Sequence, residues 1–179
     1  FGLTSAVMCI RKGWFERHWQ GVAAASLLLF GPLMIGANTL AQQLPFNAIF
    51  LVSDPAQKWR LLANFVLYML PFLAGAFFLG TVFLKAQRVF GRVYFADLTG
   101  SGLCGLLFLG AMYQLTPDQL LFVPLLLWCV GSLLWFAAVR RMRMLAWVAA
   151  VAAACAGVQL ALPAFNLPTL AVSDYKGVA

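Results

Sequence analysis

Long apolar runs, each about the length of a membrane-spanning helix, follow one another along this chain. A helix needs roughly 20 mostly apolar residues to cross the hydrocarbon core of a bilayer. Five runs reach that length, at residues 21–44, 61–84, 93–115, 120–139 and 144–162. Four of them contain no charged side chain, and the third contains only Asp97. The pattern predicts an all-α fold, a polytopic transmembrane bundle of five full spans.

The two ends of the chain carry shorter segments. Residues 1–10 are apolar and stop at Arg11 and Lys12. We expect them to be the end of a truncated span, and a short interfacial segment is the alternative, because a signal peptide carries its charges before the apolar stretch. We assign residues 1–167 to the membrane region and expect residues 168–179 to start a following extramembrane segment or domain.

The overall composition agrees with a membrane protein. Of the 179 residues, 64% are hydrophobic and 9% are charged. An average soluble domain has about 45–50% apolar and about 25% charged residues. A soluble globule of this size could not bury so much apolar surface, so the composition excludes a water-soluble enzyme, a disordered tail and a disulfide scaffold.

The basic residues predict an orientation in the membrane. Nine of them flank the runs on one side: Arg11, Lys12, Arg17, Lys85, Arg88, Arg92, Arg140, Arg141 and Arg143. Three flank the other side: Lys58, Arg60 and Lys176. By the positive-inside rule, we expect the nine in the cytoplasm and the C-terminus outside, with the bacterial cytoplasmic membrane as the location. The net charge is +7. Basic residues next to helix ends orient a membrane protein and attract anionic lipid, so we expect the partner to be the lipid bilayer and not a nucleic acid.

Polar residues inside the runs are the candidates for chemistry. Asp97, Ser101 and Gly105 follow a spacing of four, which places them on one face of a helix. An intramembrane carboxylate suggests a proton, cation or substrate site. The alternative is a buried carboxylate paired with Arg92 or with a basic residue of another loop. Asn38 and Asn64 could line a cavity or form interhelical hydrogen bonds.

Small residues spaced along the runs predict close helix packing. The predicted packing positions are Gly100, Gly105, Ala149, Ala153 and Gly157, and Ala76 and Gly80 repeat the spacing in the second run.

No catalytic, cofactor-binding or metal-binding motif is found in the sequence. His18 is the only histidine, which predicts a surface role, and no two of Cys9, Cys104, Cys129 and Cys155 are close in sequence. Because all four cysteines fall in apolar stretches, we expect buried thiols that pack as small hydrophobic groups.

Two passages resemble the membrane region of multi-pass spermidine synthase-like (polyamine aminopropyltransferase-like) proteins. In residues 68–107, a helix containing Pro71-Phe72 precedes a basic loop and a Tyr-x-x-Asp-Leu-x-Gly pattern. Tyr94, Asp97, Leu98, Gly100 and Gly105 carry this likeness, although Ser101 replaces the usual alanine and the later glycine is shifted by one position. In the second passage, residues 168–179, the likeness lies in Tyr175, Lys176 and Gly177.

The resemblance implies a non-catalytic membrane-anchoring region of a spermidine synthase-like integral membrane protein. Any aminopropyltransferase-like domain, with its S-adenosylmethionine-type ligand, would follow Ala179. One alternative function is a structural or accessory subunit of a larger membrane complex, with other membrane subunits as partners. A second alternative is a fragment of a small-solute transporter that uses Asp97.

Overall fold

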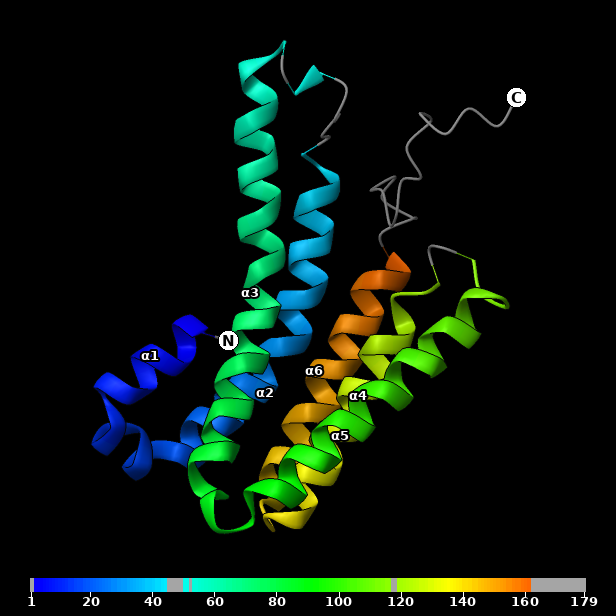
Figure 1. Cartoon of the computed structure of the whole chain (residues 1–179). Helices are drawn as coiled ribbons and strands as arrows, with labels where there is room; N and C mark the ends of the chain where they lie inside the picture. The colour runs from blue at the N-terminus through cyan, green and yellow to red at the C-terminus, as the bar shows by residue number, and fades with distance from the viewer. Residues whose placement is uncertain (1, 45–49, 52, 117–118, 162–179) are drawn as a thin grey trace.

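A computed structural model of the chain, described for residues 2–44, 50–51, 53–116 and 119–161, consists there of helices joined by loops (Figure 1). The helices are α1 (Gly2–Ile10), α2 (Lys12–Gln42), α3 (Pro55–Lys85), the short 3-10 helix η2 (Gln87–Val89), α4 (Phe90–Met112), α5 (Phe122–Ala138) and α6 (Met142–Ala161). The all-α prediction is therefore confirmed. Phe1 and the predicted extramembrane start at 168–179 lie outside the described residues.

Four helical segments are long and apolar enough to cross a membrane. They are α2, α3, the continuous segment Gln87–Met112 and α6. The fourth predicted span, 120–139, is a shorter helix of 17 residues, α5. At 1.5 Å per residue it measures about 26 Å, slightly less than the roughly 30 Å of the hydrocarbon core. The described residues thus contain four helices long enough to span a membrane and one shorter apolar helix, so the fifth predicted full span is not confirmed.

The helices begin and end at different residues from the apolar runs. α2 begins at Lys12 rather than at residue 21, and α3 begins at Pro55 rather than at residue 61. An apolar run shows only which residues can lie in the hydrocarbon core. A helix can continue beyond that run through polar residues, as long as its backbone hydrogen bonds are satisfied. At the start of α3, the Asp54 side chain accepts a hydrogen bond of 2.9 Å from the backbone N–H of Ala56, with Pro55 at the first helical position.

The other boundaries differ by less. α4 starts at Phe90 and ends at Met112, α5 covers Phe122–Ala138, and α6 starts at Met142. The end of α5 has a local cause, because the N–H of Arg141 donates to the carbonyl of Phe136 (2.9 Å) and that of Arg140 to Ala137 (3.1 Å). This pair of bonds is a Schellman motif, and it places Arg140 in the left-handed region at φ 55°.

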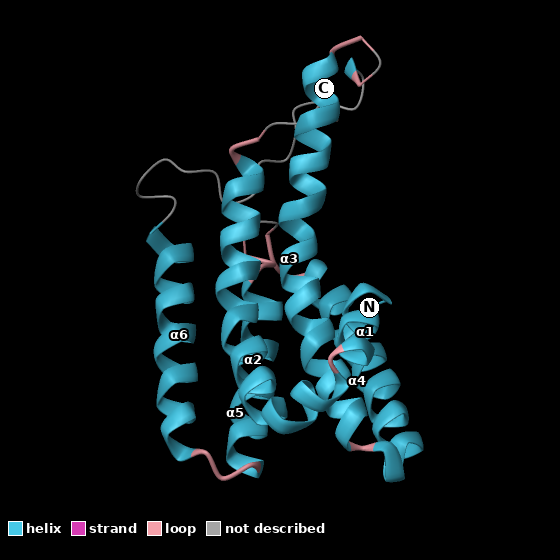
Figure 2. Cartoon of the chain, turned by 90° about the vertical axis from the view of Figure 1, so that its left-hand side faces the viewer, coloured by secondary structure: helices cyan, strands magenta, loops and turns pink. Residues whose placement is uncertain are grey.

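α2 is the central helix of the bundle. It packs along α3 on one side and contacts α5 and α6 on the other, and Figure 2 shows it between α3 and α6. Two clusters of buried side chains join α2, α5 and α6. One contains Ile35, Leu125, Trp128 and Cys155, and the other contains Ala24, Phe136 and Val148.

Trp128 of α5 is seated on α2 at Gly31. Its indole N–H donates a hydrogen bond of 2.7 Å to the carbonyl of Leu27. A Cβ on Gly31 would lie 2.7–3.0 Å from three ring carbons of Trp128. The ring therefore occupies the space that a side chain at residue 31 would need.

α4 lies at the margin of the bundle. It has no buried residue, and its contacts with described elements are mainly with η2 and α5. Figure 1 shows it rising obliquely, away from α3, after the loop that joins the two helices. A cleft lies near the start of α4, and a long exposed stretch of the helix follows it.

Candidate functional site

The candidate site is the cleft enclosed by α1, the C-terminal half of α3, η2 and the first turns of α4. It has a volume of about 680 Å³. Its walls are largely apolar, with Met8, Leu79, Phe83 and Phe90 among them. Two residues of opposite charge, Lys12 and Asp97, also line it.

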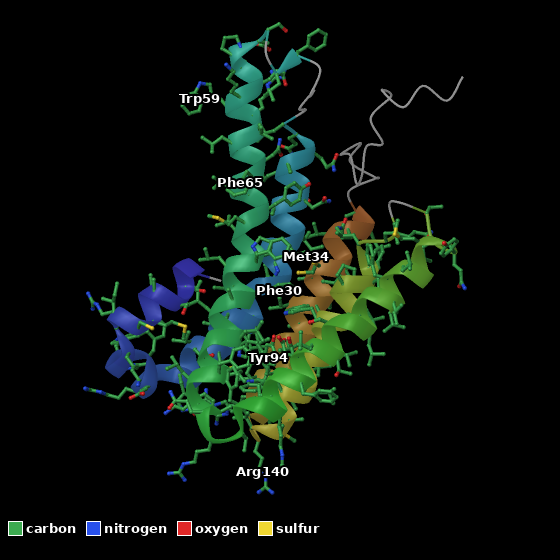
Figure 3. All side chains as sticks on the ribbon, in the orientation of Figure 1. Phe30, Met34, Trp59, Phe65, Tyr94 and Arg140 are labelled. Carbon is green, nitrogen blue, oxygen red and sulfur yellow. The ribbon has the colours of Figure 1, made fainter. Side chains whose placement is uncertain are left out.

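Asp97 lies in the second turn of α4 and is half-buried. Asp97 lines the cleft together with Tyr94, which lies three residues earlier in α4 and is labelled in Figure 3. The Tyr94 ring stacks on the Phe90 ring, with the ring centroids 5.8 Å apart. Within the described residues, no hydrogen bond or ion pair engages the Asp97 carboxylate, and Arg92 is not its partner. The predicted pairing of Asp97 with Arg92 or with a loop cation is therefore not formed among the described residues.

Lys12 approaches the same cleft from the first residue of α2. Its Nζ lies 3.9 Å from a carboxylate oxygen of Glu16, one turn along the helix, and both side chains are about half exposed. Such exposed pairs contribute little to stability, typically less than about 1 kcal/mol. Lys12 and Asp97 thus line one cleft without neutralising each other. From the sequence, Lys12 is predicted only to help orient the chain in the membrane, because no local pattern relates it to Asp97.

The predicted small, polar face of α4 is divided by the structure. Gly100, like Asp97, is half-buried, whereas residues 101–110, which include Ser101 and Gly105, are exposed all round the helix. In the described part of the chain, a Cβ added at Gly100, Gly102 or Gly105 would meet no atom within 4 Å. No described helix covers these positions, so their role in packing remains a prediction about a contact outside the described chain.

The small residues of the other helices have two different surroundings. In α3, Ala76 is buried and a Cβ at Gly80 would lie 2.5 Å from the sulfur of Met8, so α1 packs closely against α3 there. In α6, Ala149, Ala153 and Gly157 are exposed. Their predicted packing also has no partner among the described helices.

Asn38 and Asn64 are not brought to Asp97. Asn38 is buried in α2, and Asn64 donates a hydrogen bond of 3.1 Å to the carbonyl of Leu44 just after that helix. Asn64 and Asp97 line separate cavities. Asn64 therefore links α3 to the residue that follows the end of α2, and it also lines a cavity.

The predicted cytoplasmic residues gather at one end of the bundle. Arg141 donates a hydrogen bond of 2.6 Å to Gln20 of α2, and the ammonium of Lys85 lies 5.8 Å from the ring centroid of Trp19. Arg140 points away from the helices at the same end (Figure 3). We call this region the basic end. It contains the basic residues singled out in the sequence: Arg11, Lys12, Arg17, Lys85, Arg88, Arg92, Arg140, Arg141 and Arg143.

The cysteines only partly follow the prediction of buried thiols. Cys155 is buried and Cys129 half-buried, but Cys9 and Cys104 are exposed in this chain. They lie on α1 and α4, and an apolar run in the sequence does not indicate which of its faces is covered. Among the described residues, no group of three or more histidine, cysteine or acidic side chains could hold a metal ion.

A second cavity, of about 510 Å³, lies between α2, α3 and α5. Its lining is almost wholly apolar, apart from Ser26 and Ser132. It contains no charged group and offers no evident chemistry.

The composition and the four membrane-length helices define a helical membrane protein. No family model, no curated protein and no solved structure matches this chain. The resemblance to spermidine synthase-like membrane regions therefore remains a hypothesis, carried by the residues named above.

Proposed function

We propose that this chain is a non-catalytic membrane-anchoring region that packs, through residues 99–105 of α4, against a transmembrane helix outside the described chain. The first form of this proposal is the anchor of a spermidine synthase-like integral membrane protein. The second is an accessory subunit of a larger membrane complex. The supporting observation is the exposed, small-residue surface of α4.

Residues 99–105, TGSGLCG, are all small except Leu103. Each glycine inside a helix costs about 0.5–1 kcal/mol relative to alanine in water. Three such positions, Gly100, Gly102 and Gly105, meet no atom of another described helix. Within the described chain, therefore, nothing offsets this cost. Between membrane helices, small residues allow close backbone approach and strong van der Waals packing, which would offset it.

The connections between helices support α5 as a fifth crossing. α4 leaves the basic end, and α6 also starts from the basic end, where Arg141 contacts Gln20. If both cross the bilayer, α5 must return between them. We place the basic end in the bacterial cytoplasm, and the end of α6 and the C-terminus outside, because the positive-inside rule favours that orientation.

Photocross-linking from Cys104 tests the packing proposal. A benzophenone maleimide is attached to Cys104 in native membranes, in a Cys9→Ser background that removes the other exposed thiol. We expect one discrete protein adduct, which peptide mass spectrometry assigns to a transmembrane segment. The matched control carries the same label at Leu160→Cys, an exposed position on α6, in a Cys104→Ala background.

Labelling of lipid alone from Cys104, as from the control position, would contradict the proposal. Gly102→Leu gives an independent check, because its side chain fills the proposed contact and should abolish the adduct. The intact mass of the native polypeptide then separates the two forms. An adduct within a longer chain that contains a nucleotide-binding domain supports the anchor, and an adduct with a second polypeptide supports the accessory subunit.

A further inference from the structure

The cleft between α1, α3 and α4 combines apolar walls with two unlike charges. Its apolar lining includes Met8, Leu79, Phe83, Leu84 and Phe90. Such walls match acyl chains. The cleft is also lined by Lys12 and Gln87, which belong to the basic segments at the start of α2 and between α3 and α4.

Lys12 and Asp97 are presented to the cleft from different helices. Lys12 starts α2, and Asp97 belongs to α4. They form no ion pair with each other, and the only described ion pair of either is the loose contact of Lys12 with Glu16. A carboxylate near hydrocarbon without a partner is costly. A ligand that carried both a cation and an anion would satisfy both groups at once.

We propose that this cleft binds a zwitterionic phospholipid whose head group contains a primary amine, as phosphatidylethanolamine does. The phosphate lies against the Lys12 ammonium, the lipid ammonium donates hydrogen bonds to the Asp97 carboxylate, and an acyl chain follows the apolar wall. The head group then lies across the cleft, from the start of α2 to α4. This role goes beyond anchoring and does not depend on the helix partner of α4.

Other lipid classes fit the same groups less well. An anionic lipid such as phosphatidylglycerol satisfies Lys12 but brings a negative charge towards Asp97. A choline head group carries the cation but has no N–H to donate to a carboxylate. The cleft therefore selects for the primary amine, because only an ammonium with N–H groups can form a charge-assisted hydrogen bond with the Asp97 carboxylate.

Native mass spectrometry of the full chain, delipidated in mild detergent, tests this proposal. Phosphatidylethanolamine, phosphatidylcholine and phosphatidylglycerol with identical acyl chains are titrated in turn. We expect the first to bind about tenfold more tightly than the other two, because the net contribution of one hydrogen bond to a charged group corresponds to at least about that factor. Equal binding of the ethanolamine and choline lipids would overturn the proposal.

Substitutions of Asp97 and Lys12 test whether the lipid preference depends on these two charges. Asp97→Asn should remove the preference for the ethanolamine lipid over the choline lipid, and Lys12→Gln should weaken the binding of both. Lys58→Gln, at an exposed position near the start of α3 and outside the cleft, should change neither. A preference that survives in Asp97→Asn would refute the assignment.

A second measurement stands even if a variant fails to fold. A photoactivatable phosphatidylethanolamine, with its reactive group near the start of one acyl chain, is reacted with the unmodified protein. Labelled peptides from α1 and from the C-terminal half of α3 support the site. Labelling confined to other helices, or displacement of the lipid by equimolar soluble phosphoethanolamine, would overturn it.

Discussion

Replacing Gly31 with alanine tests how α5 is seated on α2. The new Cβ would lie 2.7–3.0 Å from three carbons of the Trp128 ring. The ring cannot retreat freely, because its N–H is bonded to the Leu27 carbonyl at 2.7 Å and Trp128 is only 7% exposed in the core. The substitution therefore overpacks the core, breaks the hydrogen bond, or does both.

The expected cost follows from three contributions. Overpacking a well-packed core costs about 1–3 kcal/mol. Loss of the indole hydrogen bond adds about 0.6–1.5 kcal/mol in a membrane bundle. Alanine restores about 0.8–1 kcal/mol through its better helix propensity. We therefore expect Gly31→Ala to lower the free energy of unfolding by about 1–3 kcal/mol.

The free energy of unfolding can be measured by titrating the protein in mixed micelles with a denaturing detergent and following the helical circular dichroism. Gly36→Ala is the matched control, because it lies in the same helix and a Cβ there meets no atom within 4 Å. We expect this control to be neutral or slightly stabilising. Trp128→Phe in the Gly31→Ala background should recover part of the lost stability, because the smaller ring leaves room for the new Cβ at residue 31.

The reasoning is refuted if Gly31→Ala and Gly36→Ala have the same stability. It is also refuted if Trp128→Phe adds its full cost on top of that of Gly31→Ala. Independent additivity would mean that the two residues do not compete for space.

Three further substitutions test other contacts. Gly80→Val should lower the free energy of unfolding by about 1–3 kcal/mol through overpacking against Met8, and adding Met8→Ala should recover part of that loss. An unchanged detergent titration of Gly80→Val would argue against this packing of α1 on α3. Asn64→Leu should cost about 0.6–1.5 kcal/mol by removing the hydrogen bond that holds the end of α2, whereas a gain in stability would show that the bond is unimportant. Arg140→Gly should raise the midpoint of thermal unfolding and increase the free energy of unfolding by about 1 kcal/mol, because glycine adopts the left-handed conformation without strain. A lower midpoint would contradict the Schellman geometry.

Part of the site could be predicted from the sequence. Asp97 was identified because a carboxylate inside an apolar run is costly whatever surrounds it. Ala76 and Gly80 were recognised because spacing of small residues by four places them on one helix face. Lys12 was not linked to Asp97, and neither Gly31 nor Trp128 was singled out, because each acquires its role only from a residue far away in the chain.

The amino-acid sequence by itself determined the class of protein, the order of its helices and the end at which its basic residues gather. These follow from local quantities, since the hydrocarbon thickness fixes the length of an apolar run and charge marks its ends. Only the tertiary structure decided which face of each helix is covered. The reason is that lipid and a helix interior are equally apolar, so hydrophobicity does not distinguish a packed face from an exposed one. The free surface of α4 and the cleft shared by Lys12 and Asp97 therefore emerge only when the helices are placed together.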